Sequence, residues 1–499
     1  MMLHAHRNSG SKAGRAPIRT IATLTLAASI AGCAAGPDFE RPAPPTTTQY
    51  TTTPVPNQTE SAAVRFGEAQ RIVSGGPVEA EWWRSLGSPR LDALIETALA
   101  ANPTLAAARA TLRQAQELEA ARAGSTRYPQ VDAGVGARRQ RLSPSTLGIA
   151  GEPREFSLYD AGVDVHYELD LAGGNRRELE ALAAQVDYRR YELEAARQAL
   201  VGNVAAAAIT RARLAAQIAA SDAILLGQED QLQLARERVR LGNAAPDEVL
   251  ALQTVVEQTR AELPVLRRQM QHTDHLLAVL AGQTPDAGGI PEFTLDDFTL
   301  PSELPLLVPS ELVRHRPDIR ASEALLHQAN AEYGAAVARL YPQLDLSASL
   351  GSQALSSGAL FGSGSAVWSI VGQLSQPLFN ASLPAEKRAA LAAFDAAAAH
   401  YQGVVLEALR NVADTLRAVE NDALVLAALA AADEAARGSL RAVEQRYLHG
   451  AASYVELLIA QQQAQRTRLD LAGAQAQRLA DSVALYLAIG AGWSEREPG

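Results

Sequence analysis

The chain has 499 residues, of which 47% are hydrophobic and 20% are charged, and its formal net charge is -10. A chain with this acidic balance lacks the basic face that nucleic-acid binding requires, so its composition argues against a nucleic-acid partner. Cys33 is the only cysteine, which excludes a disulfide bond within the chain.

The first 32 residues have the pattern of an export signal. Basic residues without any acidic residue precede an apolar run from Ile21 to Ala31, which is shorter than the roughly 20 residues of a membrane-spanning helix. Ile30-Ala31-Gly32-Cys33 then resembles the bacterial lipobox, in which the cysteine is diacylated and becomes the first mature residue. We therefore predict a lipoprotein signal peptide over residues 1–32 and lipidation of Cys33. A signal peptide with an incidental cysteine is the alternative.

The segment after Cys33 predicts an anchored spacer. Residue 34 is alanine rather than aspartate, which in such lipoproteins implies sorting to the outer membrane. The chain is then rich in proline and threonine as far as about Gln70, a composition typical of an extended tether rather than a packed element. Residues 33–80 are therefore predicted to be a lipidated extended tether, and the folded body is expected to start at Glu81.

The folded body contains one pattern twice. Pro103 and Gln114-Ala115 match Pro317 and Gln328-Ala329 at a single offset, and a Tyr-Pro-Gln motif follows each match. A repeat of this size predicts a tandem duplication. The chain divides into a first repeat over 81–290, a linker over 291–310, a second repeat over 311–490 and a tail over 491–499.

Each repeat is expected to begin with a helix. Apolar residues recur every seven positions from Leu91 to Leu112, within a helix predicted to run to Ala123, and again from Leu312 to Leu340. A seven-residue repeat keeps one narrow stripe facing a partner helix, so it predicts a coiled-coil seam.

After each Tyr-Pro-Gln motif the period changes from seven to two. Apolar and polar residues alternate from Tyr159 to Asp170, and again on both sides of a Gly/Ser-rich loop in the second repeat. This predicts β-hairpins over 127–171 and 341–380. Strands of about 9–11 residues with such alternation are typical of a transmembrane β-barrel, although a soluble half-buried sheet gives the same pattern.

The polar positions of the first hairpin are acidic. Because a charge that faces lipid is unfavourable, we predict that these residues face the barrel lumen and favour cations there. They are Asp160, Asp164, Glu168 and Asp170, with Asp345 as a weaker member.

A very long helix is predicted after each hairpin. Heptad steps continue from Leu179 to Leu214 before the stripe shifts by four residues, and the second repeat carries them from Leu391 to Leu426. At about 1.5 Å per residue such a helix reaches on the order of 100 Å. Each is expected to end at a glycine turn, at Gly242 and Gly450, from which a return helix about half as long runs back.

The predicted strands require more than one copy of the chain. A four-stranded sheet in lipid leaves two edges whose backbone N–H and C=O groups are unpaired, and each such group costs several kcal/mol. Further copies must close these edges. The strand pattern alone therefore predicts an oligomer of unspecified number.

Several motifs, in order along the chain, resemble the TolC-like outer-membrane factor family, and most closely its lipid-anchored efflux branch (OprM-like and NodT-like proteins). They are WWRSLGSPRLDALIETALAANPTLAAARATLRQA, YELDLAGGNRR, RPDIRASEALLHQANAEYGAA, LSQPLFN and VLEALRNVADTLRAVE. The resemblance implies an α+β membrane protein that forms a homotrimer. Each copy would contribute four strands to a 12-strand transmembrane β-barrel, and its long coiled-coil helices would form a periplasmic α-barrel.

The same resemblance implies a function and its partners. The chain would be the outer-membrane exit duct of a tripartite efflux pump, passively conducting drugs or other small toxic compounds. It would extend from the outer membrane into the periplasm, where a periplasmic adaptor (membrane fusion) protein and an inner-membrane pump would join it. The alternative within transport is the exit channel of a type I protein secretion system. A coiled-coil periplasmic adaptor is a further alternative, although adaptors lack two amphipathic strand pairs.

The resemblance also implies a gate and a docking surface near the glycine turns. Glu248 and Glu456 each lie six residues after a turn glycine, where the family often places acidic gate residues; two solvated helix-face glutamates are the alternative. The expected adaptor contacts are Leu241, Gly242, Asn243, His449, Gly450 and Ala451. Glycine at these positions also serves as a helix C-cap, and both roles are compatible.

Enzyme chemistry is not expected. His272 and His275 are spaced i, i+3 on a predicted helix, but no cysteine or third histidine follows with zinc-ligand spacing. We expect no catalytic residue, no metal and no cofactor apart from the covalent lipid on Cys33.

Overall fold

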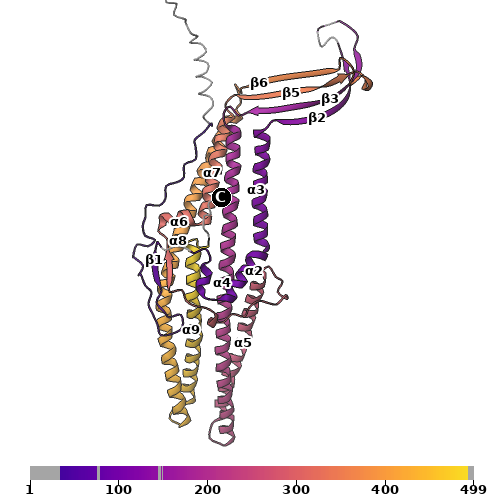
Figure 1. The fold of residues 1–499 in the computed structure, drawn as a ribbon. Helices are drawn as coiled ribbons and strands as arrows, with labels where there is room; N and C mark the ends of the chain where they lie inside the picture. The colour runs from indigo at the N-terminus through magenta and orange to yellow at the C-terminus, as the bar shows by residue number, and fades with distance from the viewer. Residues whose placement is uncertain (1–33, 76–78, 144–147, 149, 493–499) are drawn as a thin grey trace, which may run out of the picture. The chain divides into compact units, whose positions relative to one another are not determined.

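The computed structural model describes residues 34–75, 79–143, 148 and 150–492 (Figure 1). Cys33 and the predicted signal peptide lie outside the described residues. The chain forms two compact units. The first draws on residues 1–39, 118–183 and 327–395, and the second on residues 40–117, 184–326 and 396–499.

The first unit is built around an antiparallel sheet. Its strands lie side by side in the order β2-β3-β5-β6 (Figure 1), and the central pair joins the two repeats of the sequence. Within the described residues, β2 and β6 pair on one side only. The strand bounds are β2 Gln130–Leu142, β3 Arg154–Leu169, β5 Gln343–Ala354 and β6 Ala366–Ser375.

The strand register confirms the predicted alternation. Asp164 lies opposite Asp132 and Ser349, whereas its neighbour Val163 lies opposite Ala133 and Leu350. Because directly paired residues share a face of a sheet, one face is polar and the other apolar from Tyr159 to Leu169 of β3. Beyond this stretch the pattern ends, since Arg139 and Arg141 lie opposite Ser157 and Glu155 on the second face. Each Tyr-Pro-Gln motif opens a strand as expected, since β2 and β5 begin at its glutamine.

The long helices repeat with equal lengths. α4 (Gly174–Arg240) and α8 (Ser382–Leu448) have 67 residues each, and their return helices α5 (Pro246–Leu280) and α9 (Tyr454–Ala488) have 35 each. Four heptad residues of α8 (Val405, Val412, Val419 and Leu426) are buried as predicted, whereas Leu391 at the start of the series is 40% exposed. This agreement confirms the internal duplication and the coiled-coil seam.

The first helix of each repeat is broken, which the heptad pattern did not indicate. α2 (Pro89–Ala101) and α3 (Pro103–Arg127) replace the single helix expected from Leu91 to Ala123, and α6 (Pro309–His315) and α7 (Pro317–Ala338) repeat the break. The residue before each proline is extended, with ψ of 124° at Asn102 and 125° at Arg316. A proline ring excludes helical backbone at the residue before it, so the chain must leave the helix there.

The predicted tether over residues 33–80 is packed near its C-terminal end, from Thr59 to Ser74. β1 (Arg71–Ser74) pairs in parallel with β4 (Glu303–Leu306), which lies inside the predicted linker. Gln70 is fully buried and donates its amide to Pro301 O and Ser482 Oγ, both at 2.9 Å. The sequence did not indicate this packing, because the buried polar groups are stabilised by hydrogen bonds to distant residues rather than by an apolar pattern.

Short 3₁₀ helices complete the described elements. They are η1 (Trp82–Leu86), η3 (Leu295–Asp297) and η4 (Ser357–Ala359). Trp82 is 1% exposed and stacks on Tyr486 of α9 at 5.2 Å between ring centroids, so it belongs to the core of the second unit. None of the helices in the described part of the chain is long and apolar enough to cross a membrane.

Candidate functional site

The polar face of the sheet gathers the acidic residues named from the sequence. Asp160, Asp164 and Glu168 lie on the same face of β3, four residues apart, and Glu168 lies opposite Asp345 of β5. His166 Nε2 lies 4.0 Å from the Asp345 carboxylate, and an Arg138 nitrogen lies 3.8 Å from that of Asp160. This face therefore carries a net negative charge, while the opposite face carries exposed Val, Leu, Ile and Trp side chains.

Asp170 does not belong to this acidic set. β3 ends at Leu169, and the Asp170 carboxylate accepts hydrogen bonds from the backbone N–H groups of Asn175 (3.2 Å) and Arg176 (2.9 Å). These are free N–H groups at the start of α4, so the carboxylate caps the helix. The alternation was extended one residue beyond the strand, because an aspartate suits both a polar strand position and a cap.

The first described residues of the chain are held against the start of α4. Arg177, whose side chain is 4% exposed, donates to the carbonyls of Ala35 and Gly36 and pairs with Asp38 at 2.7 Å. Ala35 N–H also donates to Ala172 O at 2.8 Å.

A second set of contacts holds the same segment to α7. Asn330 Nδ2 donates to Pro37 O at 3.1 Å, and Phe39 stacks on His327 with ring centroids 4.4 Å apart. Sequence reasoning missed Arg177, although it ends the motif YELDLAGGNRR. The segment that follows Cys33 is thus fixed beside the end of β3 rather than free.

Both glycine turns have the hydrogen bonds of a helix C-cap. Gly242 and Gly450 have φ of 78° and 74°, a left-handed conformation in which glycine has no side-chain clash. Asn243 N–H donates to Arg238 O, and Ala451 N–H donates to Arg446 O, each five residues back, which is the 6→1 hydrogen bond of a Schellman motif. The C-cap role is confirmed, and docking of an adaptor remains a prediction.

The predicted gate glutamates occupy equivalent positions at the two turns. Glu248 lies 3.8 Å from Arg238, and Glu456 lies 3.7 Å from Arg446. The offset between these two pairs is the same, so each repeat links its outgoing and return helices by one Arg–Glu pair. The duplication thus reproduces a charged contact as well as a fold.

The surroundings of the two glutamates differ. Glu456 also closes a capping box with Ser453, and hydrogen bonds from the backbone N–H and hydroxyl of Ser453 lower its pKa. Glu248 is 14% exposed and lies near Tyr454, whose pKa burial and this carboxylate raise to about 12. Glu456 therefore has a local role as a helix cap, whereas Glu248 has no such capping role.

The first turn contacts the second. Arg238 lies over the ring of Tyr447 at 5.0 Å, and Tyr454 packs against a cluster formed by Leu232, Ala235, Leu252 and Val256. Two aromatic residues of the α8–α9 turn are thus fastened to the α4–α5 turn. These contacts join the α8–α9 hairpin to the α4–α5 hairpin near their turns.

No metal centre is found among the described residues, since none of them form a group of three or more His, Cys, Asp or Glu side chains that could hold an ion. His272 and His275 lie on α5. The chemistry of the described surface is that of charged faces and ion pairs.

Comparisons with known proteins agree with this geometry. The sequence profile of a family described as "Outer membrane efflux protein" matches residues 94–283 and 308–491. The chain is 30% identical to the outer membrane protein OprJ of Pseudomonas aeruginosa over 488 residues, which cover 96% of this chain and 97% of OprJ. It is 31% identical to the pyoverdine export outer membrane protein OpmQ of Pseudomonas putida, over 84% of this chain and 89% of OpmQ.

The fold has a solved counterpart. The outer-membrane channel OprN superposes with a TM-score of 0.84 and 28% sequence identity, covering 92% of this chain and 100% of the OprN chain. The similarity therefore extends over both units and both repeats.

Proposed function

The chain belongs to the outer membrane efflux protein family, and from this premise we propose that it forms the exit duct of a tripartite efflux pump. In this proposal three copies assemble in the outer membrane and join a periplasmic adaptor and an inner-membrane pump. The duct conducts drugs or other small toxic compounds passively, and the inner-membrane partner supplies the energy.

The observation that carries the proposal is the sheet of the first unit. From Tyr159 to Leu169 of β3 it is apolar on one face and acidic on the other, and its outer strands β2 and β6 each lack a second partner among the described residues. In lipid these edges need partners, and copies of the same chain supply them when the sheet closes into a barrel. The acidic face then lines the lumen.

The second candidate is the exit channel of a type I protein secretion system. OpmQ is named for pyoverdine export rather than for protein secretion, and the lipobox of this chain points the same way. Efflux is therefore the function we propose.

A covalent lipid on Cys33 fits the position of the segment that follows it. Ala35 N–H donates to Ala172 O, just beyond the end of β3, so the segment that follows the cysteine is held beside the end of a strand. A lipid attached there would enter the same membrane as the sheet. The anchor would restrain the duct without adding to its wall.

The gate proposal rests on the paired turns. Three-fold assembly would bring copies of Glu248 and Glu456 near one axis, where like charges repel, and Arg238 and Arg446 offset this repulsion. The contact of Arg238 with Tyr447 and the packing of Tyr454 against the cluster around Leu252 would hold the hairpins together in the closed state.

Replacing both Glu248 and Glu456 by alanine is expected to open the periplasmic end. Loss of both Arg–Glu pairs frees the return helices, so single-channel conductance in planar bilayers should rise several-fold and cells should admit a large antibiotic that they normally exclude. The matched control replaces Glu262 and Asp470, which occupy equivalent exposed positions further along α5 and α9. Unchanged conductance and unchanged uptake in the double variant would contradict the gate.

Neutralising Asp160, Asp164 and Glu168 as Asn, Asn and Gln is expected to remove the cation preference of the channel. The reversal potential across a salt gradient measures this preference, and it should move towards zero. Asp170→Asn is the control, because Asp170 caps α4 and asparagine caps a helix about as well as aspartate; it should leave both the reversal potential and the stability nearly unchanged. A shift caused by the Asp170 variant alone would return that residue to the lumen.

A further inference from the structure

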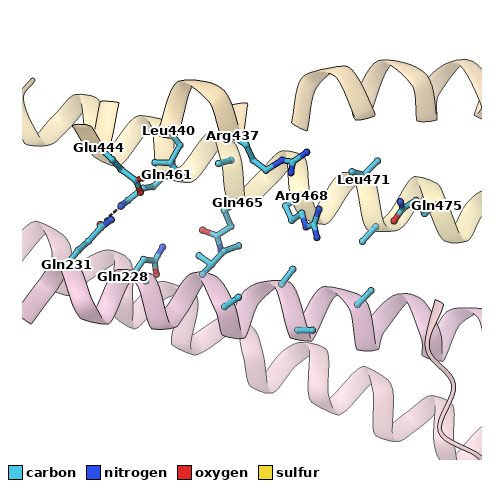
Figure 2. Close-up of a pocket in the computed structure, with 18 residues that line it drawn as sticks. Gln228, Gln231, Arg437, Leu440, Glu444, Gln461, Gln465, Arg468, Leu471 and Gln475 are labelled. Atoms are coloured by element: carbon cyan, nitrogen blue, oxygen red, sulfur yellow. Dashed lines mark hydrogen bonds between the residues drawn. The ribbon is translucent and has the colours of Figure 1, made fainter. Parts of the chain in front are cut away.

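The second unit contains a cavity between α4, α8 and α9 (Figure 2). Its volume is about 590 Å³. Pockets of about 300–1,000 Å³ accommodate drug-sized ligands, so this space is large enough for a small organic molecule.

Alanines create the cavity. Six of its lining residues are Ala216, Ala219, Ala220, Ala223, Ala464 and Ala472. A methyl group cannot fill the space that leucine or valine fills elsewhere along a coiled-coil seam. Ile224, Leu440 and Leu471 complete an apolar wall on all three helices.

A buried amide faces this space. Gln228 of α4 is 3% exposed, and neither its nitrogen nor its oxygen has a hydrogen-bond partner within the described part of the chain. Figure 2 shows its side chain rising from α4 towards α9. A buried polar group without a partner costs about 1–3 kcal/mol, and folded proteins rarely leave one unpaired. Gln228 therefore offers one donor and one acceptor to a group that enters the cavity.

A second glutamine presents an acceptor nearby. Gln461 of α9 donates its amide to Gln231 of α4 (Figure 2), and its own oxygen is buried without a partner among the described residues. The cavity thus has apolar walls and unused hydrogen-bonding capacity of both kinds.

The two arginines at the cavity pair with one buried carboxylate. Arg437 and Arg468 both lie beside Asp433, at 2.8 and 3.9 Å, and Asp433 is fully buried one heptad after Leu426. The equivalent position of the first repeat is Leu225, so this buried carboxylate belongs to one repeat only. Burial raises the pKa of Glu444, which opposes its ionisation. Because both arginines already pair with Asp433, the neutral amides of Gln228 and Gln461 are the groups left to bind a ligand, and they favour an uncharged one.

We propose that this cavity binds a small uncharged amphipathic molecule with an apolar ring body and a carboxamide-type head. The N–H and C=O of the head pair with the amide of Gln228, and the ring packs against the alanines of α4 and α9. This site lies in the helical wall and is distinct from the acidic sheet face and from the gate. The proposal does not rest on the transport function, because binding is measured on the isolated protein.

The test uses the purified full-length protein in detergent and 1-naphthamide as the probe, with binding measured by titration calorimetry. We expect saturable binding at one site per chain. The matched probes 1-naphthoate and 1-naphthylmethylammonium, which carry a negative and a positive charge on the same ring, should bind more weakly. Absence of saturable naphthamide binding, or tighter binding of either charged probe, would overturn the proposal.

Two variants locate the site. Gln228→Leu removes the donor and acceptor at similar volume and should weaken naphthamide binding about tenfold. Ala220→Phe fills the cavity and should abolish binding. The controls are Gln233→Leu, an exposed glutamine of the same helix, and Ala428→Phe, an exposed alanine at the equivalent position of the second repeat. Equal affinity in variants and controls would place the probe elsewhere.

Folding does not confound the test. Gln228→Leu replaces an unpaired buried amide by an apolar side chain, so its stability should equal or exceed that of the parent. Helical circular dichroism during thermal unfolding checks both cavity variants before titration.

Discussion

Replacing Arg478 by leucine is expected to lower the free energy of unfolding by about 3–5 kcal/mol. Arg478 lies on α9 and is 1% exposed, and it donates to Val419 O at 3.0 Å, Thr59 Oγ1 at 3.2 Å and Glu68 O at 3.4 Å. Leucine would leave these acceptors unpaired in the core and would deprive the nearby Asp481 of its positive neighbour. The midpoint of chemical denaturation, followed by circular dichroism, measures the loss.

The control for this variant lies on the same helix. Arg466 has a side chain that is 82% exposed, and Arg466→Leu should change stability by less than about 0.5 kcal/mol. Limited proteolysis should also cut the Thr59–Glu68 segment faster in the Arg478 variant, because its contacts with α9 are lost. Equal midpoints and equal cleavage rates in the two variants would show that the hydrogen bonds of Arg478 do not stabilise the fold.

Stability is expected to fall as pH rises from 5 to 8, through Asp481. Burial raises the pKa of this carboxyl to about 7, and the Asp422 carboxyl adds to the shift, while Gln477 and Arg478 oppose it. The folded-state pKa therefore exceeds that of the unfolded chain. At a pH between the unfolded and the folded pKa, folding takes up a proton at Asp481. The contribution of this carboxyl to the free energy of unfolding is therefore complete at low pH and is lost as pH rises through about 7.

Asp481→Asn is expected to remove this pH dependence. At pH 8 the variant should be more stable than the parent by on the order of 3–4 kcal/mol, because the amide is never charged. Denaturation midpoints of both proteins at pH 5 and pH 8 measure the effect, and Asp470→Asn is the exposed control on α9. A parent and variant with the same slope between these pH values would disprove the role of Asp481.

Arg478 and Ser482 of α9 bind a segment that lies far away in the sequence. The segment from Thr59 to Gln70 is joined to α9 through Arg478 and Ser482, and β1 continues it by pairing with β4. Segments more than 200 residues apart in the chain are thereby fastened to each other. The segment from Thr59 to Ser74 is therefore held in place by polar contacts.

The periodic elements were determined by the sequence alone. Heptads in α8, alternation in β3 and glycine at the turns each depend on local backbone geometry, which repeats every few residues and is visible in a single segment. The duplication strengthened these predictions, since each element is present twice. Chain order and element type therefore followed from local pattern.

Tertiary structure decided where polar groups go. Asp170 became a helix cap rather than a strand residue, and Arg177 acquired partners more than 130 residues away. Gln70 is fully buried although its side chain is polar. In each case the side chain alone is compatible with exposure, and only a distant hydrogen-bond partner makes its burial favourable.

The cavity could not be predicted from the periodicity of the sequence either. An alanine at a seam position predicts close approach of two helices, and whether the space closes depends on how α4 meets α8 and α9. Periodicity gives the face that a helix buries, but not the distance to its neighbours. That distance depends on the summed packing of all three helices, and it decides whether Gln228 is a satisfied core residue or part of a binding site.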